Sequence, residues 1–102
     1  MGDNAFARVD ALNVTILRSF RDARGLLVPV EFGEMVPFTV VRMFWVSNVP
    51  TGVSRGAHAH RSCRQFIICA AGRVRIEASD TCASRTFDLG PGQAIEIPPA
   101  IF

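Results

Sequence analysis

The sequence contains no lysine, no tyrosine and only two histidines, His58 and His60, among its 102 residues. Without lysine there can be no Schiff base or lysine general base, so the two imidazoles are the main candidates for proton transfer near neutral pH. The three cysteines lack CxxC spacing, which argues against a zinc knuckle or a disulfide framework and favours free thiols in a reducing compartment. No apolar run approaches a membrane span, and residues 1–12 lack the apolar segment of a signal peptide. We therefore expect a cytoplasmic protein with no membrane partner.

The basic residues are all arginine, eleven in number, and the net charge is only +2. Planar guanidinium groups pair bidentately with phosphate, so some of them suit an anionic ligand, although most are expected on a solvated surface. Because the arginines form no stripe or cluster, no nucleic-acid partner is predicted. A hydrophobic content of 49%, with eight phenylalanines, predicts a single packed domain over residues 1–102.

Short β-type segments separated by turn residues fill most of the chain. They are rich in β-branched and aromatic residues, and no segment carries a sustained helical period, which is typical of an all-β sandwich or barrel. Within one of them the alternation places Val74 and Ile76 inward. Residues 1–12 are expected to be a flexible or strand-swapping arm. The expected strands cover residues 13–20, 26–31, 38–48, 65–70, 73–78, 85–89 and 94–97.

His58 and His60 are two residues apart, so on a strand their side chains share one face. Three interpretations are open: two ligands of a metal site, a pair for general acid–base catalysis, or two histidines with no role beyond packing or solvation. A metal site needs at least a third ligand, and the sequence has no third histidine.

The spacing of Gly52, His58, His60, Gln65 and Gly72 resembles the first motif of the cupin barrels. Metal-binding cupins place a glutamate ligand where this chain has Gln65, and the chain ends before the histidine of the second cupin motif. A neutral amide in place of a carboxylate weakens a divalent-cation site, so neither a metal nor another cofactor is predicted.

A further set of segments occurs in order along the chain: RDARGL at 21–26, Glu31, PF at 37–38, RMFWV at 42–46, RGAHAH at 55–60 and QFIIC at 65–69. Over about residues 14–102 this set resembles the WxcM-like cupins that act as sugar-nucleotide 3,4-ketoisomerases. This resemblance implies a cupin-type, RmlC-like jelly-roll β-barrel and a homodimer. It also implies an isomerase that moves the carbonyl of a dTDP-linked 4-keto-6-deoxyhexose from C4 to C3 without a metal, in the biosynthesis of deoxyamino sugars and surface polysaccharides.

By the same resemblance His58 and His60 are the acid–base residues, and the sequence does not decide which of them is the base. Arg55 would hold a diphosphate or an enediolate, and Gln65 would orient a histidine or bind a sugar hydroxyl. The remaining residues implied in substrate binding are Arg42, Phe44 and Trp45.

Two features depart from the family pattern. Relatives commonly carry tyrosine where this chain has Phe44 and Trp45, and they continue for several strands beyond the position of Phe102. The barrel is therefore expected to be incomplete or completed by a partner subunit. The alternative functions are a non-catalytic cupin that binds a sugar nucleotide or a partner protein, and a metal-dependent cupin.

Overall fold

The computed structural model describes residues 9–54, 64–80 and 82–99. Within them lie seven strands and one short 3-10 helix, and none of the described helices is long and apolar enough to cross a membrane. The prediction of an all-β chain is confirmed. The elements are η2 (Val9–Ala11), β1 (Val14–Ile16), β2 (Phe20–Asp22), β3 (Gly25–Leu27), β4 (Gln65–Cys69), β5 (Val74–Ser79), β6 (Ser84–Leu89) and β7 (Gln93–Ile97).

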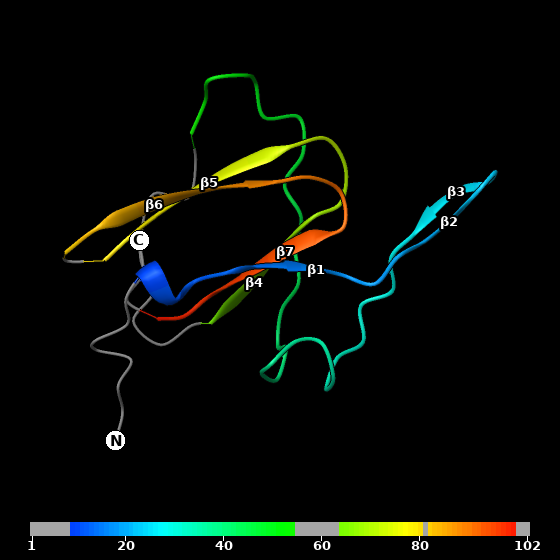
Figure 1. The fold of residues 1–102 in the computed structure, drawn as a ribbon, viewed down its shortest axis with the longest axis horizontal. Helices are drawn as coiled ribbons and strands as arrows, with labels where there is room; N and C mark the ends of the chain where they lie inside the picture. Colours follow the sequence, from blue (N-terminus) through cyan, green and yellow to red (C-terminus); the bar gives the residue numbers. More distant parts are fainter. Residues whose placement is uncertain (1–8, 55–63, 81, 100–102) are drawn as a thin grey trace.

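The strands form a three-stranded sheet in the order β1-β7-β4 and two hairpins, β2–β3 and β5–β6. All of these pairings are antiparallel. In Figure 1 the β5–β6 hairpin runs alongside the three-stranded sheet, whereas the β2–β3 hairpin projects away from it. Among the described residues the three sheets do not join into one hydrogen-bonded barrel, which agrees with the expectation of an incomplete barrel.

The hydrophobic core lies between the three-stranded sheet and the β5–β6 hairpin. In both layers the side chains along each strand point alternately toward the core and away from it. Complete burial of a large aliphatic side chain stabilises the fold by about 1.5–3 kcal/mol, and Leu89, Ile95 and Val9 are each buried completely. The core cluster consists of Val9, Leu12, Cys69, Ala78, Phe87, Leu89, Ile95 and Ile97.

The turn between β2 and β3 forms where the sequence predicts it. The Asp22 carboxylate accepts a hydrogen bond from the backbone N–H of Arg24 at 2.8 Å, which closes an Asx turn. Gly25 follows with φ of 127°, a conformation that residues with a Cβ rarely adopt. β3 ends at Leu27, short of the predicted residue 31, and Pro29 lacks the N–H that a longer ladder would require.

The predicted strand at residues 38–48 is wrong: this segment is irregular in the structure and forms no ladder. Its residues have high β propensity, but a strand also needs a neighbour for its backbone groups, and propensity depends on that context. Asn48 has φ of 60°, which interrupts an extended backbone. In β5, Ile76 packs against the core as predicted, whereas Val74 at the strand end keeps 38% of its surface exposed.

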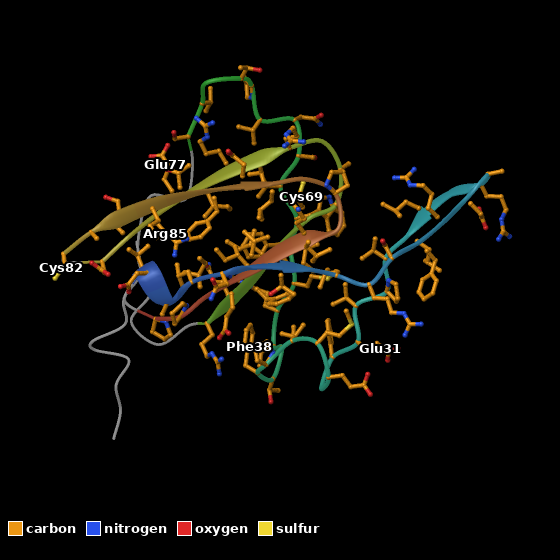
Figure 2. All side chains as sticks on the ribbon, in the orientation of Figure 1. Glu31, Phe38, Cys69, Glu77, Cys82 and Arg85 are labelled. Carbon is orange, nitrogen blue, oxygen red and sulfur yellow. The ribbon has the colours of Figure 1, made fainter. Side chains whose placement is uncertain are left out.

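The β5–β6 hairpin holds η2 at both ends. At the first end, the backbone N–H of Val9 donates to the Asp80 carboxylate at 2.7 Å. At the other end, Nη1 of Arg85 donates to the carbonyl oxygens of Val9, Asp10 and Leu12 at 3.4, 3.3 and 3.1 Å. Figure 2 shows Arg85 beside η2. The unpaired backbone groups of this short helix are thus bound by side chains from the hairpin.

Replacement of Arg85 by methionine is expected to lower the free energy of unfolding by about 1–2 kcal/mol, because three carbonyl oxygens lose a charged donor. The measurement is the urea midpoint of purified protein. Arg75→Met is the matched control, since Arg75 pairs with Asp88 on the exposed side of the same hairpin and should matter little. Equal midpoints for the two variants would contradict this role of Arg85.

Candidate active site

The predicted site residues fall into two groups. Arg55, His58 and His60 lie outside the residues that the structure describes, so their arrangement stays a prediction. The other predicted residues, Gln65 on β4 and Arg42, Phe44 and Trp45 in the irregular segment, are described.

Gln65 is the first residue of β4, and its register places its side chain on the core face of the sheet. It pairs with Ile97, and the next residues on the same face are Ile67 and Cys69. Ile97 and Cys69 belong to the buried core, whereas Gln65 is half-buried at the end of the row. A neutral amide at this point can donate and accept hydrogen bonds at the rim of the apolar interior.

Arg42, Phe44 and Trp45 lie in an exposed part of the irregular segment. Cζ of Arg42 lies 5.2 Å from the centre of the Phe44 ring, within the range of a cation–π contact. Phe44 is 61% exposed and Trp45 is 81% exposed. Among the described residues, no hydrogen bond, ion pair or ring contact joins these three to Gln65. The structure therefore brings Arg42 and Phe44 together but leaves them separate from Gln65.

The sequence analysis missed a cluster beside Gln65. Nε of Arg64 donates to Oε2 of Glu96 at 3.0 Å, Nη2 donates to the same oxygen, and Cζ lies 5.0 Å from the ring centre of Phe38. Phe38, labelled in Figure 2, is also part of the wall of a surface hollow of about 610 Å³ formed by residues 32–34 and 36–40. Because 32 residues separate Arg64 from Glu96 in the chain, no local pattern predicted this pair.

The resolved pKa shifts lie outside this region. Hydrogen bonds from the Arg24 guanidinium and from the backbone N–H of Arg24 lower the pKa of Asp22. A hydrogen bond to Asp88 raises the pKa of Arg75. Both are exposed ion pairs within hairpins. In the part of the chain that the structure describes, no three His, Cys, Asp or Glu side chains gather as a metal site would require.

Cys69 is a free thiol, as predicted. Cys69 is buried in the core, and Cys82 is exposed near the β5–β6 turn.

Comparison with protein families gives a match over residues 10–102 to the family described as FdtA: WxcM-like, C-terminal. A curated relative, the TDP-4-oxo-6-deoxy-alpha-D-glucose-3,4-oxoisomerase of Aneurinibacillus thermoaerophilus, is 28% identical over 82 residues. That alignment covers 79% of this chain, and the chain spans 59% of the length of the relative.

Solved structures of similar fold are also sugar ketoisomerases. One is QdtA, a 3,4-ketoisomerase of Thermoanaerobacterium thermosaccharolyticum that was determined as a double mutant with TDP. Its superposition has a TM-score of 0.83 at 26% sequence identity and covers 89% of this chain and 67% of the QdtA chain. The WlaRB TDP-quinovose 3,4-ketoisomerase of Campylobacter jejuni gives a TM-score of 0.79 at 27% identity, covering 88% of this chain and 70% of its own. The cupin-type fold expected from the sequence is confirmed.

Proposed function

Because the chain belongs to the WxcM-like, C-terminal family, we propose that it is an isomerase that moves the carbonyl of a dTDP-linked 4-keto-6-deoxyhexose from C4 to C3. The observation that carries this proposal is the family match over residues 10–102, a range that includes both histidines and Gln65. The curated relative is a TDP-4-oxo-6-deoxy-alpha-D-glucose-3,4-oxoisomerase and QdtA is a 3,4-ketoisomerase, and both activities support the proposal. The reaction would belong to deoxyamino-sugar and polysaccharide biosynthesis in the cytoplasm.

The proposed chemistry is an enediol isomerisation that uses His58 and His60. The C4 ketone acidifies the proton on C3; one imidazole removes that proton while O4 gains a proton, and a 3,4-enediol forms. The hydroxyl at O3 then loses its proton as C4 is protonated, so the carbonyl ends at C3 with no net change in electrons. Two imidazoles can share these transfers, since an imidazole can both accept and donate a proton, and each positioned transfer contributes about 10²–10⁴-fold to the rate.

The residues around the histidines would bind and orient the substrate. Gln65 lies at the rim of the core face, where its amide can bind a sugar hydroxyl or orient a histidine. Arg55 and Arg42 supply guanidinium groups for the diphosphate, and the exposed rings of Phe44 and Trp45 supply flat apolar surfaces for stacking. We propose that this reaction requires no metal, since Gln65 offers a neutral amide where metal-binding cupins have a carboxylate.

We propose that the protein works as a homodimer in which the apolar strip, residues 41–46, pairs with its copy. The exposed side chains of this strip include Val41 at 94%, Met43 at 71% and Trp45 at 81%, and such contiguous apolar surface is typical of an interaction site. Arg42 is the only charge in residues 38–54. In a two-fold antiparallel pairing centred on Phe44, Arg42 faces Val46 of the copy, so no like charges meet.

The experiment that tests the reaction is proton NMR of the protein with dTDP-4-keto-6-deoxyglucose in deuterium oxide, beside a protein-free control. Deuterium should enter at C3 and C4 as a 3-keto product appears. His58→Asn and His60→Asn should each lower turnover about a hundredfold or more while ligand binding persists, because each removes one acid–base group.

Line-broadening of the nucleotide signals without exchange would support the non-catalytic binding function instead. Full activity in both histidine variants would exclude the imidazole mechanism. Stoichiometric iron, zinc or manganese in active protein, lost together with activity on chelation, would favour the metal-dependent alternative.

The dimer can be tested through Trp45, which is the only tryptophan of the chain. As the protein concentration rises, sedimentation should show a monomer becoming a dimer. Over the same range, acrylamide should quench the Trp45 fluorescence less, because the partner covers the ring. Val41→Asp should keep the protein monomeric and the quenching high, since it places a charge in the pairing strip. Ser84→Asp, on the exposed end of β6, is the control. A dimer that forms equally well with Val41→Asp would contradict pairing through the strip.

A further inference from the structure

Arg64 is held on the outer face of the three-stranded sheet, directly before Gln65. Phe66 pairs with Glu96 in the β4–β7 ladder, so these two side chains share a face. Arg64 is two residues before Phe66, and its guanidinium hydrogen-bonds Glu96 and stacks on Phe38 at 5.0 Å. This outer face is opposite the core face that carries Gln65, Ile67 and Ile97.

The β4–β7 ladder begins at this point, because Gln65 and Ile97 form its terminal pair. Strand ends fray more readily than strand centres, so the register at a terminal pair depends on anchoring from its neighbours. A slip of one residue would exchange the two faces of a strand. If Arg64 stays bound to Glu96 and Phe38 on the outer face, then Gln65 must point to the core face.

The other described ion pairs do not have this arrangement. The pairs Arg24–Asp22 and Arg75–Asp88 each lie within a single hairpin. The side chains of Arg24 and Asp22 are 90% and 53% exposed. Those of Arg75 and Asp88 are 67% and 56% exposed. Arg64 and Glu96 are only 40% and 32% exposed, and they connect the start of one strand to the end of another. The Phe38 contact further ties the ladder end to the segment that leads into Arg42 and Phe44.

We propose that Arg64 is a positioning residue for Gln65: its bonds to Glu96 and Phe38 on the outer face fix the start of β4 so that the Gln65 amide points to the substrate. This inference rests on the proposed isomerase function and on the role of Gln65 within it. Arg64 itself lies on the opposite face from the amide and does not touch the substrate.

The test is a double-variant cycle on the isomerase, with kcat/KM measured for Arg64→Met, Gln65→Ala and the combined variant. Arg64→Met should lower kcat/KM about tenfold, since small misplacements of a site residue are costly. In the Gln65→Ala background the same change should have no further effect, because the residue that Arg64 positions is gone. Arg64→Lys, which keeps the charge and can still bond Glu96, should recover part of the loss.

Arg75→Met serves as the matched control and should leave kcat/KM unchanged in either background. Equal losses from Arg64→Met with and without Gln65 would overturn the proposal, since a general loss of stability acts in both backgrounds. An unchanged kcat/KM in Arg64→Met would overturn it as well.

A second measurement separates this proposal from the function on which it rests. If the wild-type protein shows no isomerisation, the proposed function fails, and amide hydrogen exchange then decides the role of Arg64. Exchange at residues 65–67 should accelerate in Arg64→Met but not in Arg75→Met, while exchange along β5 and β6 stays the same. Unchanged exchange at residues 65–67 would show that Arg64 does not fix the start of β4.

Discussion

The antiparallel pairing of β4 with β7 is the interaction on which the other features depend. Its five residue pairs run from Gln65 with Ile97 to Cys69 with Gln93, and they assign every side chain to one of two faces. The core face buries Ile95 and Ile97 against β5–β6, and this burial sets the register, since a slip of one residue would expose that row. The same register leaves Gln65 half-buried at the rim. One constraint therefore fixes both the core and the position of a candidate site residue.

The elements around this ladder are held in different ways. The Asp80 and Arg85 side chains bind the two ends of η2 and so place Val9 and Leu12 in the core. The β2–β3 hairpin, in contrast, has only exposed residues, and an isolated two-stranded hairpin is marginally stable in water. The apolar strip at residues 41–46 is exposed as well. The well-packed part of the domain thus carries Gln65, whereas the parts with uncovered apolar surface carry Arg42, Phe44 and Trp45.

The sequence was sufficient for the fold class, because the alternation in β5 and the turn residues between strands are local signals. It also proposed Gln65 as a site residue, through the spacing of a known motif, and that assignment stays a prediction. It failed at residues 38–48, where high β propensity had no strand to pair with, and the Arg64–Glu96 pair was invisible because tertiary structure alone brings those residues together. A usable signal was overlooked: arginine stands two residues before phenylalanine at Arg18, Arg42, Arg64 and Arg85. In every case but Arg64, which stacks on Phe38 instead, the guanidinium stacks on that ring. Among the described residues the pattern would have predicted three of the four cation–π contacts, and it would have given the wrong ring for Arg64.

The central proposal is that Gln65, at the start of β4, faces a binding site for a nucleotide-linked sugar. The most direct test is a titration of ¹⁵N-labelled protein with TDP-4-keto-6-deoxyglucose, followed through the side-chain amide signals of Gln65. These signals should shift along a saturation curve, while the amides of the β2–β3 hairpin stay in place. Unchanged Gln65 signals at saturating ligand would contradict a site at this end of β4.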